Sequence, residues 1–443
     1  MYLNYLTFLL IILVVFDYFC LFNKKLSTPA LLFNLGFCLC SIFLLHFADL
    51  WNVELSYETF ILVASGNISV CFGSLIVSLF FNKKKLCCKD NKINLCVISL
   101  NKIKFFLLLQ IIDAFIKCRL LMNFYGTSSV SQALFMHTLA LKFDGDVMQY
   151  PIGLGFISST IGIASTIVPG LCAFYVNNSQ ISTKVKIWML INFIFALAFS
   201  FLSSGRMSSL YMLIAFCTVY SLSFYSRKRR FPIRKIFNYL LLVIVFLFSF
   251  QYVGELIGRD KSDVTPDIVV GVYCGAELIN LDDLILENNY IPDNELWGNQ
   301  TFYSFYNTLK NYDLVSLKIP YSEFIPFNEA GGYGIGNVAS AFQNYYFDFG
   351  LFGAIIVCFF LGGISEFIHQ KTLSSCFFRN GIIDSWVVLY ILLIPAMFLS
   401  FFAEQFFNQL SNIISLKFWV KLIIIYIIFY SRKPPLFYIR PKI

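Results

Sequence analysis

The run Thr59-Phe-Ile-Leu-Val-Ala-Ser-Gly-Asn-Ile-Ser-Val-Cys-Phe-Gly-Ser-Leu-Ile-Val-Ser-Leu-Phe-Phe81 contains no charged residue. As a helix, with a rise of about 1.5 Å per residue, it is long enough to cross the roughly 30 Å hydrocarbon core of a bilayer. A helix is required there because no water is present to satisfy free backbone N–H and C=O groups. This stretch therefore predicts a membrane-spanning helix, and the rest of the chain repeats its pattern.

Further apolar runs of similar length recur along the 443 residues, of which 58% are hydrophobic and only 13% charged. The sequence thus predicts an all-α, polytopic integral membrane protein with about eleven transmembrane helices. The other predicted runs are 2–22, 30–50, 105–122, 152–176, 187–203, 207–225, 236–257, 349–368, 382–402 and 412–430. The first run lacks a basic leader and a small-residue cleavage site, so we expect it to remain as a helix. Asp113 and Lys117 interrupt the run 105–122, but at four residues apart they can neutralise each other.

Basic residues mark one side of the predicted membrane protein. Of the 33 Lys and Arg residues, 23 lie in six segments on the same side of an eleven-helix zigzag. The positive-inside rule assigns that side to the cytoplasm, which predicts a periplasmic N-terminus and a cytoplasmic C-terminus. The net charge of +8 is therefore mainly a topology signal. A nucleic-acid partner is not expected, because the sequence holds no folded basic domain that would read bases.

The longest polar connection, Gly258–Val338, joins predicted helices 8 and 9 on the outer side. It divides the chain into residues 1–257 with helices 1–8, the large periplasmic loop 258–338, and residues 339–443 with helices 9–11 and a cytoplasmic tail. The loop has four basic and twelve acidic residues, a net charge of −8, and many aromatic residues. Aromatic rings stack on sugars, and carboxylates and amides pair with hydroxyls. An interfacial aromatic belt or a loop core would use the same residue types.

Cysteines and isolated acids give no site of their own. Only Cys274 of the thirteen cysteines lies in the large loop, so no disulfide framework is predicted, and the spacings do not suggest zinc. We expect no metal and no cofactor. The acids Glu366, Asp384 and Glu404 lie at the ends of predicted helices, and we expect them to be solvated.

Three arginines depart from the positive-inside trend. Arg206 lies in a very short outer turn between two helices, Arg259 directly follows the eighth helix, and Arg119 is near the outer end of the fourth. Guanidinium groups suit bidentate phosphate binding. The simpler interpretation is that each side chain extends to lipid phosphates or forms a local salt bridge.

The stretch Gly336-Asn-Val-Ala-Ser-Ala-Phe-Gln-Asn-Tyr-Tyr-Phe-Asp-Phe-Gly-Leu-Phe-Gly353 resembles a motif of the oligosaccharide repeat unit polymerases. These are the Wzy-type O-antigen and capsule polymerases of bacteria. Their segment after the large outer loop reads Asn-x-x-Thr, an aromatic run, then Asp-Phe-Gly-x-x-Gly; Ser340 stands here where Thr is usual. Ser203–Ser209 resembles their Gly-Arg-Ser turn, and Tyr273–Asp282 is similar to their loop stretch after the eighth helix. Asn337 is also a possible N-cap of the next helix.

This resemblance implies a reaction at the periplasmic face of the bacterial inner membrane. The family joins repeat units carried on undecaprenyl pyrophosphate: an acceptor hydroxyl attacks the anomeric carbon of the growing chain, and the lipid pyrophosphate leaves. Cations must then stabilise the charge on the leaving group, and a carboxylate can orient or deprotonate the hydroxyl. The implied partners are the lipid-linked oligosaccharide, the bilayer and a chain-length regulator protein. The expected catalytic residues are Glu255, Asp260 and Glu329, and the expected substrate-binding residues are Arg206, Arg259, Arg119, Tyr303, Tyr306, Tyr333 and Asn337.

Two other functions stay open. A flippase for the same lipid-linked units would be a transporter, and transporters often show internal repeats with broken helices. The halves of this chain show no such repeat. The related O-antigen ligases usually have a histidine near the glycines of the outer loop, and none lies between Gly258 and Val338. Both observations favour the polymerase.

Overall fold

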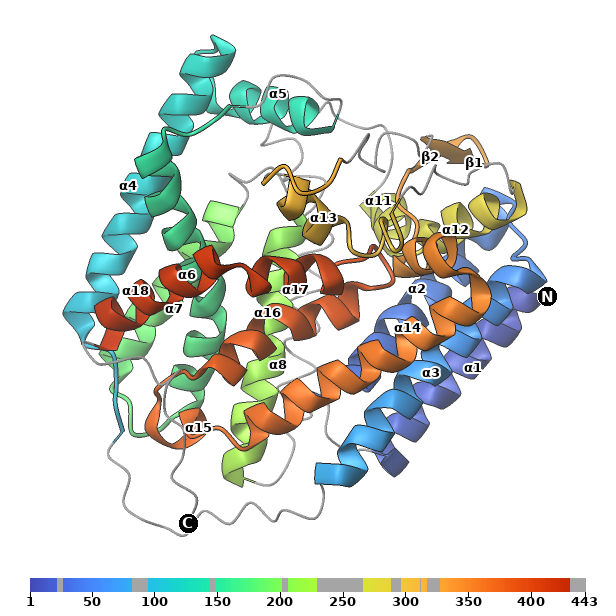
Figure 1. Cartoon of the computed structure of the whole chain (residues 1–443), viewed down its shortest axis with the longest axis horizontal. Helices are drawn as coiled ribbons and strands as arrows, with labels where there is room; N and C mark the ends of the chain where they lie inside the picture. Colours follow the sequence, from blue (N-terminus) through green and yellow to red (C-terminus); the bar gives the residue numbers. More distant parts are fainter. Residues whose placement is uncertain are drawn as a thin grey trace. The chain divides into compact units, whose positions relative to one another are not determined.

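The computed structural model describes residues 1–21, 27–81, 95–142, 148–200, 206–228, 266–287, 296–310, 312–316 and 327–430, and these residues are mostly helical. Contact clustering divides the chain into two compact units. Unit 1 comprises residues 1–86, 264–371 and 393–414, and unit 2 comprises residues 87–263, 372–392 and 415–443. Figure 1 shows the helices of both units, coloured along the sequence.

Apolar helices long enough to span a membrane dominate the described residues. Seven helices meet this description, and the count is eight if α17 (Phe406–Ile414) and α18 (Leu416–Tyr430) form one bent span. The seven are Tyr2–Phe19, Pro29–Trp51, Tyr57–Phe81, Ile152–Asn177, Thr183–Ser200, Met207–Ser226 and Ala341–Asn380. The prediction of a helical protein with several membrane-spanning segments is thereby confirmed. The helices at the predicted runs 105–122 and 382–402, Leu100–Tyr125 and Ser385–Leu399, are not among these spans, the second being shorter. The predicted run 236–257 lies outside the described residues, so the number eleven stays a prediction.

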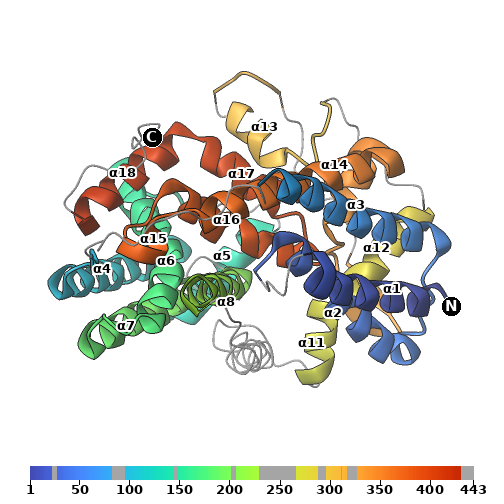
Figure 2. The ribbon, with the colours of Figure 1, turned by 90° about the horizontal axis from the view of Figure 1, so that it is seen from below.

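Unit 1 is built on four long helices that lie side by side (Figures 1 and 2). These are α1 (Tyr2–Phe16) with its π-helical turn η1 (Asp17–Leu21), α2 (Pro29–Trp51), α3 (Tyr57–Phe81) and α14 (Ala341–Leu373). Shorter elements complete it: α11 (Pro266–Cys274), α12 (Ala276–Glu287), α13 (Tyr303–Lys310), β1 (Asn328–Ala330), β2 (Tyr333–Gly336) and α17 (Phe406–Ile414). The large loop therefore has secondary structure of its own.

Small residues let the unit 1 helices approach closely. A Cβ on Gly362 of α14 would lie 2.2 Å from the Val70 carbonyl oxygen of α3. The Ser74 hydroxyl of α3 donates to the Gly362 carbonyl oxygen at 3.0 Å. Helices in membranes associate through such close packing and interhelical hydrogen bonds, since lipid tails supply no hydrophobic force between them. The α3–α14 pair is therefore fixed in register.

Polar groups also join the N-terminal helices. The Asn34 amide of α2 donates to the Asp17 carboxylate at 2.6 Å, and the Cys71 thiol of α3 donates to the same carboxylate at 3.4 Å. All three side chains are buried. These bonds link η1, α2 and α3 inside a region where an unpaired polar group would be costly.

Unit 2 is a helical bundle with an internal ion pair. Its helices are α4 (Leu100–Tyr125), α5 (Val130–Lys142), α6 (Ile152–Asn177), α7 (Thr183–Ser200), α8 (Arg206–Lys228), α15 (Phe377–Asn380) and α18 (Leu416–Tyr430). Helix α16 (Ser385–Leu399) begins in unit 2 and ends in unit 1. The Lys117 ammonium lies 3.5 Å from the Asp113 carboxylate, which also accepts the Ser158 hydroxyl at 3.1 Å. The structure therefore confirms the predicted neutralisation of these two charges.

Two of the three acids at predicted helix ends are buried, so our expectation that they are solvated is wrong. Glu366 has no exposed surface, and its carboxylate lies within 3.2 Å of His369 and accepts the Gln370 amide at 2.5 Å. Glu404 is 3% exposed and accepts the backbone N–H of Phe407 at 2.7 Å, at the N-terminus of α17. Hydrogen-bond donors close in the chain offset the free-energy cost of burying both carboxylates.

Candidate functional site

The first part of the large loop packs into unit 1. Helix α11 lies against α2, where a Cβ on Gly271 would meet the Phe47 ring at 2.5 Å. Gly275, which follows α11, lies against Leu44 of α2. An ideal Cβ on Gly275 would lie 2.9 Å from the Leu44 nitrogen. Phe47 and Leu44 are about one helical turn apart on α2, so the connection between α11 and α12 lies well inside the helix bundle.

Helix α12 carries its acids into the interior. Glu277 is 1% exposed, and the Cys40 thiol of α2 donates to its Oε2 at 3.9 Å. Asp282 accepts the Ser56 hydroxyl at 2.5 Å and the Ser56 backbone N–H at 3.1 Å. Ser56 precedes α3, so Asp282 fixes α12 to the connection between α2 and α3. An acidic stretch that the sequence places in a solvated loop is thus part of the core of unit 1.

A β-hairpin covers the other side of α12. The Asn280 amide donates to the Val338 carbonyl oxygen at 2.8 Å, and the Asn328 amide donates to the Asn280 side-chain oxygen at 3.1 Å. Strands β1 and β2 are antiparallel, with Glu329 opposite Gly334. The hairpin turn includes Gly331, at φ +58°, whose ideal Cβ would lie 2.3 Å from the Leu50 carbonyl oxygen of α2. The turn therefore requires glycine for both backbone conformation and space.

Three of the predicted site residues lie on or beside this hairpin. Glu329 is exposed on β1, while Tyr333 on β2 and the following Asn337 are half-buried. Asp283 on the neighbouring helix lies 3.5 Å from the Asn328 amide. We call the group of Asp283, Asn328, Glu329 and Tyr333 the hairpin surface. It combines carboxylates, an amide and an aromatic ring, the residue types that pair with sugar hydroxyls and stack on sugar rings.

Asn337 does not cap α14. The first helical residue of α14 is Ala341, and the Phe342 N–H donates to the Ser340 hydroxyl at 3.3 Å. The expectation that Asn337 is the N-cap is therefore wrong, and Ser340 performs this role. Serine is among the residues that cap helix N-termini most effectively.

The Asp-Phe-Gly motif fastens the second part of the loop to α14. The Asp348 carboxylate accepts the backbone N–H groups of Gln300 at 3.1 Å and Thr301 at 2.6 Å. The Phe349 ring lies 4.9 Å from the Trp297 ring, measured between centroids. Gly350 has φ +65° and ψ −173°, which interrupts α14 at this point. The sequence motif therefore has a structural role that the sequence alone did not indicate.

The predicted tyrosines Tyr303 and Tyr306 lie on α13, beyond this attachment. The Tyr306 hydroxyl donates to the Trp297 carbonyl oxygen at 2.7 Å. The Ser304 hydroxyl donates to the Asn408 side-chain oxygen at 2.7 Å, which joins α13 to α17. Both tyrosines are half-buried, so they present part of each ring at the surface of unit 1.

The predicted arginines belong to unit 2 or lie outside the described residues. Arg119 on α4 is exposed, and its guanidinium lies 5.6 Å from the Phe115 ring centroid. Arg206 is the first residue of α8, and its side chain lies outside the described part of the structure. Glu255, Arg259 and Asp260 also lie outside the described residues. The distances between these side chains and the hairpin surface therefore stay untested.

Burial changes the acidity of the loop carboxylates. Burial raises the pKa of Glu277 well above its usual range. Burial also raises the pKa of Asp283, and the neighbouring Asp282 and Glu287 add to the effect. A carboxyl group with a raised pKa is a better proton acceptor than an ordinary one. Asp283 is the group on the hairpin surface that best combines this property with partial exposure.

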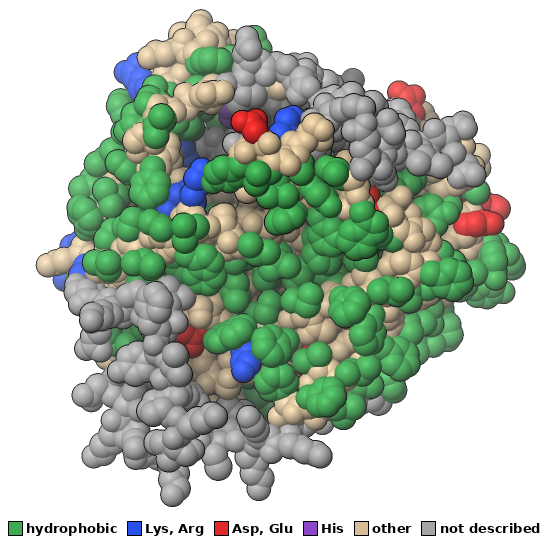
Figure 3. Space-filling model, in the orientation of Figure 1, with side chains coloured by type: hydrophobic (Ala, Val, Ile, Leu, Met, Phe, Trp, Pro, Cys, Tyr) green, Lys and Arg blue, Asp and Glu red, His purple; other side chains and the backbone are tan. Residues whose placement is uncertain are grey.

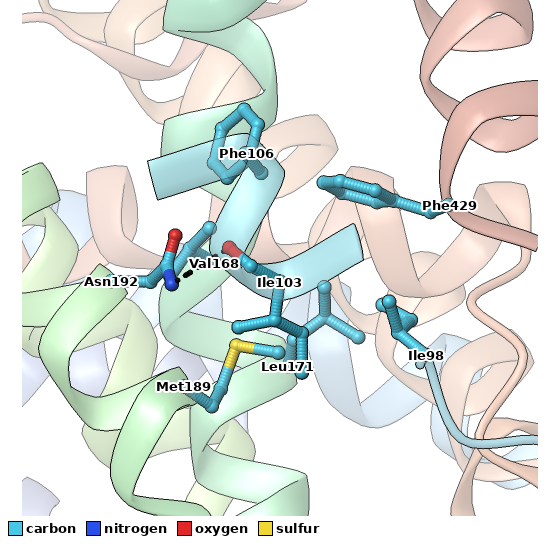
Figure 4. Close-up of a pocket in the computed structure, with 8 residues that line it drawn as sticks. All are labelled: Ile98, Ile103, Phe106, Val168, Leu171, Met189, Asn192 and Phe429. Atoms are coloured by element: carbon cyan, nitrogen blue, oxygen red, sulfur yellow. Dashed lines mark hydrogen bonds between the residues drawn. The ribbon is translucent and has the colours of Figure 1, made fainter. Parts of the chain in front are cut away.

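A small pocket in unit 2 is lined almost entirely by apolar side chains. Figure 4 shows apolar side chains from α4, α6, α7 and α18 around it, with Ile98 at one side. Its single polar side chain is Asn192, whose amide donates to the Ile103 carbonyl oxygen at 3.2 Å. Within the described ranges, no three His, Cys, Asp or Glu side chains gather closely enough to hold a metal ion.

The sequence did not predict the roles of four acids of the loop region and α14. These are Glu277, Asp282, Asp283 and Asp348. The available signal was the amphipathic pattern of 276–287, in which apolar residues repeat at helical spacing between the acids.

Comparisons with known proteins found no similarity: no family model, no curated protein and no solved structure matches the chain. The apolar helices define the class, a multi-pass helical membrane protein.

Proposed function

We propose that the chain is a polymerase that joins lipid-pyrophosphate-linked oligosaccharide repeat units at the periplasmic face of the bacterial inner membrane. The hairpin surface is the observation that carries this proposal. The Asn328 amide lies 3.5 Å from the Asp283 carboxylate, and Glu329 and Tyr333 stand on the same two-stranded hairpin, in a loop that packs against apolar helices. A lipid-linked sugar needs such a combination, because its lipid stays in the bilayer while its sugars require polar partners.

In the proposed reaction, an acceptor hydroxyl oxygen forms a bond to the anomeric carbon of the donor chain. The bond between that carbon and the pyrophosphate oxygen breaks, and the pyrophosphate leaves with the electron pair. A carboxylate receives the hydroxyl proton, and among the predicted bases Glu329 is the one whose position is described, exposed on β1. Arg206, Arg259 and Arg119 are the proposed cations that stabilise the leaving pyrophosphate.

The orientation of the chain follows from the same proposal. With the basic segments in the cytoplasm, the connection between α2 and α3 lies outside, and Asp282 holds α12 at that connection. The hairpin surface then faces the periplasm, where the lipid-linked units and a chain-length regulator protein would meet it.

Deletion of the gene in its host tests the function. A polymerase deletion leaves single repeat units on the lipid A core and removes the ladder of chain lengths seen on a polysaccharide gel. Long chains that persist after deletion would refute the proposal. Polymer that is built on the carrier but not transferred would indicate a ligase, and repeat units that stay on the cytoplasmic side would indicate a flippase.

A further inference from the structure

The lipid-facing side of α14 defines where the membrane lies against unit 1. Exposed apolar side chains follow one another at intervals of three or four residues, which places them on one face of the helix. They are Phe352 at 81% exposure, Ile356 at 56%, Phe360 at 58%, Ile364 at 37% and Phe367 at 38%. Figure 3 shows hydrophobic side chains over this part of the molecular surface. In a spanning helix, such a stripe contacts lipid tails.

A basic residue marks one end of this stripe and a backbone break marks the other. At the C-terminal end, the Lys371 ammonium lies 5.3 Å from the Phe367 ring centroid and 5.6 Å from that of Phe81. At the other end lies the backbone break at Gly350. The twenty helical steps from Leu351 to Lys371 span about 30 Å, the thickness of a bilayer hydrocarbon core. The stripe thus matches one full crossing.

The second half of the large loop is attached at the Gly350 end of this crossing. The Trp297 ring contacts Phe349 at 4.9 Å, one residue before the break. Asp348 holds the backbone of Thr301 beside it. Helix α13 follows, packed on α17, and the hydrophobic surface continues from α14 to these elements in Figure 3. The attachment point therefore lies at the boundary between lipid tails and head groups.

This part of the loop exposes large apolar side chains that a solvated loop would cover. Trp297 is 74% exposed, Phe305 on α13 is 41% exposed, Tyr312 is 59% exposed and Leu314 is 68% exposed. Contiguous exposed apolar residues on a protein surface mark a contact with another body. Tryptophan and tyrosine are enriched at membrane interfaces, where the ring is apolar and its polar edge reaches water.

We infer that Trp297, Phe305, Tyr312 and Leu314 form an interfacial contact with the bilayer, so that α13 rests on the membrane surface instead of extending into water. The occupant of this surface is the lipid head-group region, because the group continues the lipid-facing stripe of α14 at its end. The inference holds whatever reaction the chain performs. It gives the loop a fixed depth, at which the head group of a membrane lipid can reach it.

Quenching of Trp297 fluorescence tests this contact in the full-length protein. The protein is reconstituted into phosphatidylcholine–phosphatidylglycerol vesicles, and the emission of Trp297→Phe is subtracted from that of the wild type. Trp297 is mostly exposed, so this substitution leaves the fold intact. Phospholipids brominated near the head group should remove most of the Trp297 emission. Phospholipids brominated near the chain ends should remove little, and aqueous acrylamide should have a weak effect.

The matched control is Trp51→Phe. Trp51 is 1% exposed and its ring stacks on that of Phe47 with 5.0 Å between centroids, and phenylalanine keeps an aromatic ring at this position. Its subtracted emission should respond to neither quencher. Strong acrylamide quenching of Trp297 without lipid quenching would place the loop in water and overturn the inference. A Trp297 response to neither quencher would show that Trp297 is covered by protein, such as a second copy of this chain, which would overturn the inference equally.

Discussion

Asp348 on α14 holds the backbone of Thr301 in the large loop, with 2.6 Å between its Oδ2 atom and the Thr301 nitrogen. The two residues are 47 positions apart in the chain. The same carboxylate accepts the N–H of Gln300, and the Asn344 amide donates back to the Gln300 carbonyl oxygen at 3.0 Å. These bonds make the second half of the loop a fixed part of unit 1.

Asp348→Ala should release this half of the loop. Each hydrogen bond to a charged group contributes about 2 kcal/mol, so local opening becomes easier by at least that amount. Hydrogen exchange measured by mass spectrometry should then be faster at residues 296–310, by about 30-fold. Glu287→Ala, which removes an exposed carboxylate of α12, is the control and should leave exchange there unchanged. Unchanged protection in Asp348→Ala would show that packing alone holds the loop.

Ser56 and Asp282 should prove energetically coupled. Ser56→Ala removes the 2.5 Å hydroxyl bond and retains the backbone N–H bond, while Asp282→Ala removes both. In a double-mutant cycle of thermal stability in detergent, we expect a coupling free energy of about 1 kcal/mol or more. Asp282→Ala should be the more damaging single substitution, because it also leaves the Ser56 N–H unpaired. Strict additivity would show that the bond does not stabilise the fold.

The apolar runs were sufficient to predict the helices, whereas the interior of the loop was not predictable from them. Helices α2, α3, α6 and α14 occur where uncharged stretches require internal backbone hydrogen bonds. Asp282 is buried only because Ser56, 226 positions away in the chain, supplies its donors. A contact over such a distance leaves no local pattern, so the sequence did not indicate which acids of the loop are buried. Glu404 differs, because its hydrogen-bond donors, the N–H groups of Phe407 and Asn408, lie only three and four positions away. Its burial follows from the packing of neighbouring elements around it, which its position at a predicted helix end does not reveal.

Gly362 and Gly363 offer a matched pair of tests for the packing of α14 on α3. A Cβ at Gly362 would lie 2.2 Å from a backbone oxygen, whereas at Gly363 its nearest neighbour is the Val77 side chain at 3.6 Å. Gly362→Ala should therefore destabilise the protein by about 2 kcal/mol through forced separation of the helices. Gly363→Ala should be neutral or slightly stabilising, because alanine favours helix. Thermal unfolding in detergent measures both, and equal effects would contradict the observed register.

Stability should depend on pH through Glu404, which lies between α16 and α17. Burial raises its pKa from 4.5 to about 8, although the N–H groups of Phe407, Asn408 and Phe406 oppose the shift. Between these two values the folded state holds a proton that the unfolded state has lost, so stability falls as pH rises from about 5 to 8. Glu404→Gln should weaken this dependence in thermal unfolding curves recorded across that range. Glu287→Gln removes an exposed carboxylate and should leave the pH dependence of stability unchanged. A wild-type protein whose stability rises with pH over this range would refute the assignment.

Arg206→Ala tests the proposed reaction at its leaving group. If Arg206, the first residue of α8, stabilises the pyrophosphate, its loss should reduce polymer formation on the order of 100-fold. Arg206→Lys should recover only part of the activity, because an ammonium cannot bind phosphate in the bidentate manner of a guanidinium. Chain-length ladders on polysaccharide gels measure the outcome, and immunoblots confirm equal protein levels. Lys310→Ala removes an exposed cation of α13 and should give a normal ladder. A normal ladder from Arg206→Ala would exclude Arg206 from the site, whereas loss in both variants would indicate a general requirement for positive charge.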